Sequence, residues 1–235
     1  MNTARTLVAL ATYNEIENLP ALVDEILRVL PAADILVVDD NSPDGTGRWC
    51  DEQAHSERRL RCLHRPRKQG LGSATLDAAR FAIVNDYELF VTMDADWSHD
   101  PKHLPELVRA TEHADVAIGS RYIAGGAIKG WPLHRRMMSR VVNRLSRLLL
   151  HLPVHDSSGA FRAYRVARLK QIHLDNIQAA SYAYLEEILW HLHRVDATFA
   201  EVPITFRQRR AGRSKINVRE AAAKLAVWLR LAKRN

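Results

Sequence analysis

The sequence predicts an α/β protein built on a mostly parallel sheet that helices flank on both faces. Its short apolar runs are continuous rather than alternating, which is typical of strands buried on both faces. Segments with a helical spacing of apolar residues separate these runs, so strands and helices alternate along the first half. Polar and glycine residues follow where the runs end, and ligands of such sheets bind outside the carboxyl ends of the strands.

The first half supplies the strands and the helices that connect them. Five apolar runs are expected to form strands, at residues 7–11, 35–38, 60–63, 89–93 and 116–118. Asn18, Leu19 and Pro20 open an amphipathic helix that continues to about residue 30, because a capping residue followed by an early proline is a start signal. A second helix is expected over about residues 73–84.

The second half predicts amphipathic helices over residues 134–152 and about 218–231. The first carries apolar residues at Met137, Met138, Val141, Val142, Leu145, Leu148, Leu149 and Leu152. Five arginines are interleaved with them, at Arg135, Arg136, Arg140, Arg144 and Arg147. Each helix has two interpretations: one apolar face packs on the core, or a basic amphipathic element lies at an anionic membrane surface.

Composition and charge limit the classes of protein that this sequence can encode. The chain has 235 residues, 47% of them hydrophobic and 26% charged, a globular balance that fits one domain over residues 1–235. The net charge of +7 favours anionic partners. Two cysteines without a CxxC motif indicate a reducing cytoplasm. The N-terminal apolar stretch is too short for a signal peptide, and no window reaches the length of a membrane helix, so we expect any membrane contact to be peripheral.

Asp94, Ala95 and Asp96 follow the apolar run 89–93 and carry the clearest chemical signal. Two carboxylates at alternate positions of a strand end point the same way and repel each other unless a cation lies between them. A hard divalent ion, Mg²⁺ or Mn²⁺, is the natural partner, and it would bridge to substrate phosphates. The alternative is a solvated acidic turn, but the position after a buried strand favours the metal.

Other polar segments are weaker signals. Asp39 and Asp40 end another expected strand, where a carboxylate can accept hydrogen bonds from a base edge or a ribose. Asp44 suits a helix cap, and no GxGxxG or Walker A motif is present. His99, His103 and His113 lack metal-ligand spacing, so we expect them to have surface or capping roles.

Together these segments resemble family 2 inverting glycosyltransferases, and more specifically the dolichol- or polyprenol-phosphate mannose synthases. The donor half and metal motif of that family resemble residues 12–15, 38–46, 70–72, 93–96 and 98–99. The mannose synthases are similar to residues 119–122, 130–131, 156–162, 202–204, Arg209, Gly212, Ser214 and Lys215. The resemblance implies a Rossmann-like fold of the GT-A type, with a nucleotide-sugar half up to about residue 120 and an acceptor half from about residue 121.

The resemblance also implies roles for individual residues. The donor, GDP-mannose, would contact Tyr13, Glu15, Val38, Asp40, Asp94, Ala95, Asp96, Arg209 and Lys215. The metal would take Asp94, Asp96 and Ser98, and the phosphate of a polyprenyl or dolichyl acceptor would contact Arg121, Arg135 and Ser139. Asp96 and Arg121 are the expected catalytic residues. Three residues differ from those common in the family: Ala11, Ser98 and Asp100. The differences affect the expected third metal ligand and the expected fit of the donor.

The implied reaction is metal-dependent transfer of mannose to a lipid phosphate with inversion, which gives a β-linked product. The chain would lack transmembrane helices and act at the cytosolic face of a membrane, recruited by its basic surface or by an anchoring partner protein. Alternatives are another donor such as UDP-glucose or UDP-N-acetylglucosamine, a non-lipid acceptor, and a silent partner subunit. A nucleic-acid-binding protein is suggested by charge alone, and the 7% of aromatic residues form no stacking cluster.

Overall fold

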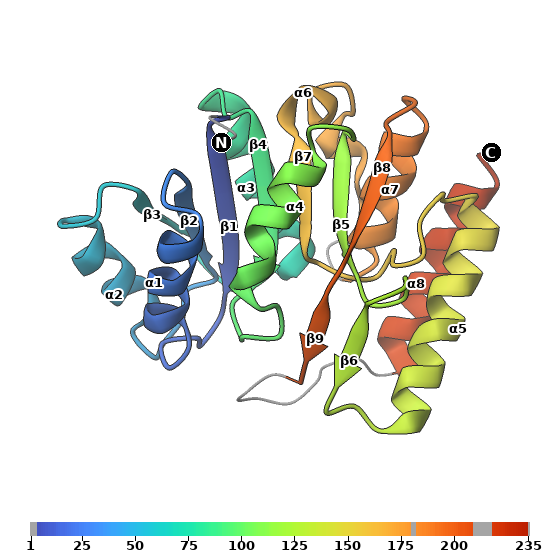
Figure 1. The fold of residues 1–235 in the computed structure, drawn as a ribbon, viewed down its shortest axis with the longest axis horizontal. Helices are drawn as coiled ribbons and strands as arrows, with labels where there is room; N and C mark the ends of the chain where they lie inside the picture. The colour runs from blue at the N-terminus through green and yellow to red at the C-terminus, as the bar shows by residue number, and fades with distance from the viewer. Residues whose placement is uncertain (1–3, 180–181, 209–217, 235) are drawn as a thin grey trace.

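The computed structural model describes residues 4–179, 182–208 and 218–234. Its centre is a seven-stranded sheet with strand order β3-β2-β1-β4-β7-β5-β8, and helices cover both faces (Figure 1). The strands are β1 Thr6–Thr12, β2 Asp34–Asp39, β3 Leu60–His64, β4 Leu89–Asp94, β5 Val116–Ser120, β7 Arg162–Arg165 and β8 Phe199–Pro203. All pairings are parallel except those of β7, which runs antiparallel between β4 and β5.

Two apolar clusters, one on each face of the sheet, explain why the strand sequences are continuously apolar. Leu7 and Ala9 of β1 belong to one cluster, and Val8 and Leu10 belong to the other. Successive side chains of a strand point to opposite faces, so a strand covered on both sides buries every residue. The helices are α1 Leu19–Val29, α2 Thr46–Ala54, α3 Leu71–Val84, α4 Leu104–Ala110, α5 Leu133–Leu150, α6 Val166–Leu169, α7 Tyr184–His193 and α8 Val218–Ala232, with short 3-10 turns η1 Pro101–His103 and η2 Leu174–Asn176.

A second, two-stranded sheet lies beyond the carboxyl end of β5. It pairs β6 (Ala127–Lys129) in parallel with β9 (Thr205–Arg207). The backbone N–H of Arg207 donates to the carbonyl of Ser98 at 3.0 Å, which ties this small sheet to the loop that follows β4. The second half of the chain is thereby folded back over the strand ends of the first half.

The five predicted strands and both first-half helices are confirmed, with boundaries that differ by one or two residues. Strand β7 was not predicted. Its sequence Arg162-Ala163-Tyr164-Arg165 is short and charged, yet Arg162 is fully buried and donates to the Leu185 carbonyl at 2.7 Å. Its terminal nitrogens donate to the carbonyls of Ser157 and Leu185, and no local pattern reveals a partner 23 residues away. Strands from both predicted halves share one sheet, so the division near residue 120 stays a prediction.

Helix α5 turns most of its apolar side chains outward. Asn143 and Ser146 are buried, together with Leu150. The exposed large apolar residues of this helix are Leu133, Met137, Met138, Val141, Leu145 and Leu148. The interpretation that α5 packs its apolar face on the core is therefore wrong for most of the predicted residues. We call this exposed set the α5 apolar face.

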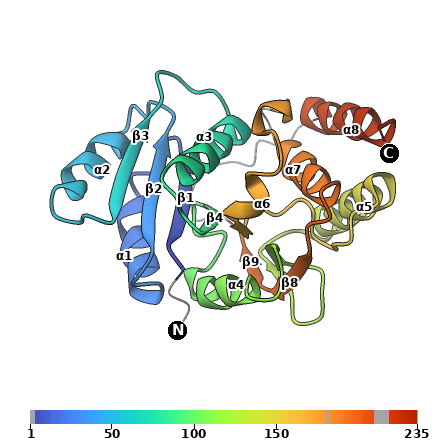
Figure 2. The same cartoon turned by 90° about the horizontal axis from the view of Figure 1, so that it is seen from above.

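Helix α8 lies beside α5 at the end of the molecule remote from α1 and α2 (Figure 2). Trp228 and Leu231 are buried, whereas Leu225 and Leu229 are about half exposed. Lys224 and Arg230 pair with the buried Glu186 and Glu187 of α7. Among the helices of the described residues, none has both the length and the hydropathy needed to cross a membrane.

Candidate active site

The strand ends that carry the predicted donor residues meet at one edge of the sheet. Strands β1, β2 and β4 are parallel neighbours, with Thr12 opposite Asp39 and Ala11 opposite Asp94. Val38 and Asp94 line the same small pocket, between the sheet and α3. Residues from sequence positions 12, 39 and 94 therefore lie side by side, as the carboxyl ends of parallel strands do.

The loop after β4 presents the two carboxylates at different depths. The Asp94 side chain is 31% exposed, whereas Asp96 is buried. The backbone N–H of Ser98 donates to Asp96 Oδ1 at 3.0 Å, which orients that carboxylate. Carboxylate oxygens are the donors that Mg²⁺ and Mn²⁺ prefer, so this pair fits a hard divalent cation.

His99 is buried and packs against this loop, which corrects the expectation of a surface or capping role. Its ring stacks on Phe161 with a centroid distance of 5.2 Å. The backbone N–H of Asp94 donates to His99 Nδ1 at 3.1 Å. Burial lowers the pKa of His99 to about 4, so the ring is neutral and able to accept that hydrogen bond. The signal available in the sequence was its place three residues after Asp96.

Both carboxylates at the end of β2 are held by neighbouring residues. Asp39 accepts from the hydroxyls of Thr12 at 2.9 Å and of Ser42 at 2.5 Å. Asp40 lies 2.8 Å from the guanidinium of Arg65 and accepts from the backbone N–H of Gly70 at 3.3 Å. Gly70 has a φ of 98°, a conformation that favours glycine, and it is the N-cap residue of α3. Asp40 thus fixes the backbone at residues 69–70, just before α3.

The predicted base-binding residues lie at the end of β1. The ammonium of Lys68 lies 3.5 Å from the centroid of the Tyr13 ring, a cation–π contact. Glu15 Oε2 accepts from the amide of Asn18 at 2.8 Å. The N-cap of α2 is Gly45 rather than Asp44, which lies one residue earlier and accepts from the backbone N–H of Thr46 at 3.0 Å. The backbone N–H of Glu15 donates to the Thr46 hydroxyl at 3.1 Å, so this segment lies next to the start of α2.

Arg121, just after β5, makes a bidentate ion pair with Asp156. Its Nε and one terminal nitrogen each donate to this carboxylate at 2.7 Å. Both residues are buried. Burial by itself would raise the pKa of Asp156, but the neighbouring Arg121 outweighs it and holds that pKa below its usual range. The same guanidinium also donates to the Ser158 hydroxyl at 2.8 Å, so Arg121 is rigidly placed.

Aromatic rings surround the Arg121 guanidinium. Its central carbon lies 5.3 Å from the ring centroids of Tyr122 and Phe206 and 5.8 Å from that of Trp131. Arg135 lies over the Trp131 ring at 4.0 Å. Arg121 and Arg135, two of the predicted acceptor residues, thus both lie against the Trp131 ring. Phe206 also makes an edge contact with His99, at 5.3 Å between centroids, which links this group to the Asp94 loop.

Ser139, the third predicted acceptor residue, lies on α5 within the same group. Its hydroxyl accepts from the Tyr122 hydroxyl at 2.6 Å. Asn143, one turn further along, donates both to the Ser139 carbonyl and to the Ser158 hydroxyl, at 2.9 Å each. Asn143, Asp156, Trp131 and Phe206 were given no role from the sequence, although Asp156 and Trp131 belong to segments that resemble the mannose synthases.

The predicted site residues thus fall into two groups. The donor and metal residues Tyr13, Glu15, Val38, Asp40, Asp94, Ala95, Asp96 and Ser98 belong to the strand-end edge and its loops. Arg121, Arg135 and Ser139 gather around Tyr122 and Trp131. Arg209 and Lys215 lie outside the described residues.

Comparison with known proteins places this arrangement among the glycosyltransferases of the GT-A fold. A mannosyltransferase from Pyrobaculum calidifontis, solved with GDP-Man and Mn²⁺, aligns with a TM-score of 0.67 at 18% identity, over 99% of this chain and 65% of its own. Glucosyl-3-phosphoglycerate synthase from Mycobacterium tuberculosis, solved with Mn²⁺ and UDP, aligns with a TM-score of 0.69 at 18% identity, over 98% of this chain and 80% of its own. These likenesses confirm the predicted fold.

The chain belongs to glycosyl transferase family 2, whose model matches residues 7–172. It is 42% identical over 231 residues to a polyprenol monophosphomannose synthase from Mycolicibacterium smegmatis, across 96% of this chain and 87% of that protein. It is 40% identical over 227 residues to an undecaprenyl-phosphate mannosyltransferase from Micrococcus luteus, across 95% of this chain and 93% of that protein. The predicted family and enzyme class are confirmed.

Proposed function

We propose that this glycosyltransferase transfers mannose from GDP-mannose to a polyprenyl phosphate, with dolichyl phosphate as the closest chemical alternative. The observation that carries the proposal is the contact chain His99–Phe206–Trp131, which joins the Asp94 loop to the two arginines. A site for a sugar diphosphate and a site for an acceptor phosphate would then be neighbours. The names of the relatives at 40–42% identity support the same substrates.

The donor would lie along the strand-end edge. Tyr13, with Lys68 at its ring, offers a flat surface for the base, and Asp40 and Glu15 offer carboxylates for polar groups of the nucleoside. Asp94 and Asp96 would hold the divalent ion, with Ser98 as the predicted third ligand. When bound, such an ion neutralises the charge that develops on the departing diphosphate. The mannose-transfer assay, run with each ion in turn, measures whether Mg²⁺ or Mn²⁺ is preferred.

The acceptor would lie at Arg121, Arg135 and Ser139. A phosphate monoester has a second pKa of about 6, so it is largely dianionic at neutral pH and already nucleophilic. The main barrier is electrostatic, because this dianion must approach a sugar diphosphate. Guanidinium groups offer planar, paired donors to phosphate oxygens, and Asp156 with the aromatic rings holds Arg121 in one orientation.

In the proposed reaction, one oxygen of the acceptor phosphate forms a bond to the anomeric carbon of mannose. The bond from that carbon to the diphosphate oxygen breaks, and GDP leaves with the electron pair. A single in-line displacement inverts the anomeric centre and gives a β-linked mannosyl phosphate lipid. No general base is required, because the nucleophile carries no proton at the attacking oxygen.

The test is transfer of radiolabelled mannose from GDP-mannose to a polyprenyl phosphate in detergent, with and without Mg²⁺ or Mn²⁺. UDP-glucose and UDP-N-acetylglucosamine run as parallel donors. We expect metal-dependent label in the lipid phase from GDP-mannose alone. Lipid label from a UDP-sugar instead would replace the donor, and tight GDP binding without lipid label from any donor would rule out the lipid acceptor.

Variants of the same assay locate the site. Asp96→Asn is expected to reduce transfer at least about a hundredfold, since it removes one of two charges from the cation site. Asp24→Asn on the exposed surface of α1 is the matched control and should transfer at the wild-type rate. Equal activity of the two variants would refute the assignment of Asp96.

We also propose that the enzyme meets its lipid substrate as a peripheral protein, with the α5 apolar face on the bilayer. Six exposed apolar side chains on one helix, interleaved with the exposed Arg140, Arg144 and Arg147, suit the boundary between acyl chains and anionic headgroups. The same helix carries Ser139 and Arg135, so a lipid phosphate bound there would stay close to the membrane. A cytoplasmic location and an anchoring partner protein remain predictions.

A further inference from the structure

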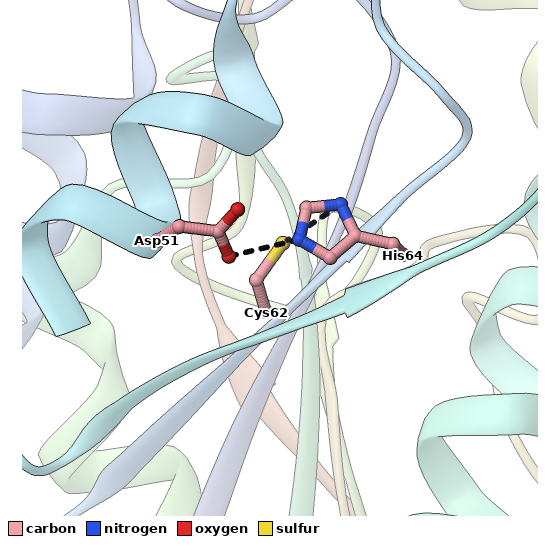
Figure 3. A group of neighbouring side chains, drawn as sticks. All are labelled: Asp51, Cys62 and His64. Carbon is pink, nitrogen blue, oxygen red and sulfur yellow. Dashed lines mark hydrogen bonds and ion pairs between the residues drawn. The ribbon is translucent and has the colours of Figure 1, made fainter.

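A group of metal-ligating side chains lies between α2 and β3, at the edge of the main sheet. Asp51 comes from α2, and Cys62 and His64 come from β3, the edge strand of the main sheet (Figure 3). One ligand atom from each of the three lies within 4.8 Å of the others. Cys62 and His64 occupy alternate positions of β3, which puts both side chains on the face that α2 covers.

The hydrogen bonds determine which nitrogen of His64 is available. Its Nε2 lies 2.8 Å from Asp51 Oδ1, and a carboxylate accepts, so Nε2 carries the proton. Nδ1 then has its lone pair, and it lies 3.9 Å from Cys62 Sγ. A carboxylate that orients an imidazole in this way is the usual outer partner of a metal-bound histidine. The spacing of nitrogen and sulfur is close to the ~3.6 Å expected for two ligands of one tetrahedral Zn²⁺.

The other cysteine of the chain is adjacent. Cys50 is buried on α2 and belongs to the apolar cluster against which Cys62 packs. Because the thiolate is the form of cysteine that binds metals, coordination by Cys62 would exchange a proton for the metal: the S–H bond breaks, the metal–sulfur bond forms, and one proton leaves to solvent.

We infer that Cys62 and His64, oriented by Asp51, form a binding site for a thiophilic divalent cation of the Zn²⁺ class. Sulfur and imidazole ligands prefer such ions to Mg²⁺ or Mn²⁺, so the site differs in chemistry from the Asp94–Asp96 pair. The side chains of His64 and of its partner Asp51 are 52% and 54% exposed, so an ion and its water ligands can reach the imidazole.

The site lies close to the strand-end edge without belonging to it. His64 is the register partner of Asp39 at the carboxyl ends of β3 and β2. An added Cβ at Gly47 would lie 3.1 Å from both Asp39 Oδ2 and His64 Cε1, so the two side chains flank the same glycine. A cation bound to His64 would thus stand one side chain away from Asp39. The inference does not depend on the proposed substrates.

The test is titration of the full chain with Zn²⁺ alone by calorimetry, under reducing conditions and with excess Mg²⁺. Co²⁺ serves as a spectroscopic probe, since a thiolate ligand gives it a charge-transfer band. We expect one Zn²⁺ to bind and the Co²⁺ complex to show that band. Cys62→Ser and His64→Gln should each weaken Zn²⁺ binding at least about tenfold, and Asp51→Asn about 10–100-fold, as for other partners of metal-bound histidines.

Two controls separate this site from other ligands of the chain. His55→Gln alters a neighbouring histidine, whose Nδ1 lies 2.7 Å from the Asp51 carbonyl, and should bind Zn²⁺ like the wild type. Asp96→Asn should also leave the Zn²⁺ affinity unchanged. Wild-type affinity in both Cys62→Ser and His64→Gln, absence of the Co²⁺–thiolate band, or loss of binding in Asp96→Asn would each overturn the inference. Circular dichroism of each variant verifies that it is folded.

Discussion

At the scale of single residues, the Arg121–Asp156 pair connects the fold to the proposed chemistry. It holds a guanidinium in place behind β5, within a ring of aromatic side chains. A buried ion pair adds little net stability, but removal of one partner leaves an uncompensated buried charge. The pair therefore determines the orientation of Arg121 more than the overall free energy of unfolding.

Asp156→Asn is expected to lower the free energy of unfolding by about 3–5 kcal/mol, because Arg121 stays buried without its counter-charge. Urea unfolding measures this change. The matched control is Asp175→Asn, whose ion pair with Arg80 is exposed, with 90% of the Asp175 side chain accessible. We expect that control to cost less than about 1 kcal/mol. Similar losses in the two variants would contradict the assigned role.

The same carboxylate makes the stability pH-dependent in a defined direction. The folded-state pKa of Asp156 is depressed, so its contribution is fully present above the unfolded pKa of about 3.9 and is lost as the pH falls through the folded value. Between about pH 5 and pH 2 the wild type should therefore lose more stability than Asp156→Asn. Urea titrations at several pH values measure both slopes, and parallel slopes would argue against a depressed pKa.

At the scale of elements, α5 combines a polar buried face with an apolar exposed one. The buried side of α5 faces the segment 156–158, where Asn143 and Ser146 find hydrogen-bond partners in Ser157 and Ser158. The outer side carries the α5 apolar face and the arginines between its members. This inversion of the usual pattern is what supports contact with a bilayer rather than with the core.

Met138→Glu combined with Leu145→Glu is expected to weaken binding to anionic vesicles at least about tenfold, because two charges would enter the apolar boundary. The melting temperature should change little, since these side chains are 62% and 45% exposed. Co-sedimentation with vesicles measures the binding. Val84→Glu, at a 78% exposed position on α3, is the control and should bind like the wild type. Unchanged binding of the double variant would remove α5 from the membrane contact.

At the scale of the whole molecule, the net charge of +7 adds a long-range attraction to anionic surfaces. Salt screens such attraction, with a Debye length of about 10 Å at 0.1 M and about 3 Å at 1 M. Binding to anionic vesicles should therefore weaken more than about tenfold over this range, whereas binding to neutral vesicles should not weaken. Co-sedimentation at both salt concentrations is the measurement, and salt-independent binding to anionic vesicles would show that the charge plays no part.

The sequence by itself determined the parallel strands, the place of the Asp94–Asp96 pair and the family. Each of these depends on short-range pattern: a continuous apolar run predicts a strand buried on both faces, and polar residues at its end predict the binding edge. The helical spacing of α5 was equally visible, and so was its amphipathic character.

Only the tertiary structure decided which face of α5 is buried, where β7 inserts and which partner Arg121 takes. The hydrogen-bond partners that bury Asn143 and Ser146 come from segment 156–158 across a loop, and Asp156 reaches Arg121 over 35 residues. Likewise, Asp51 joins Cys62 and His64 only because α2 packs on β3. Periodicity reports which residues share a face, but the free energy of burial depends on what that face meets, and that is determined by the assembled chain.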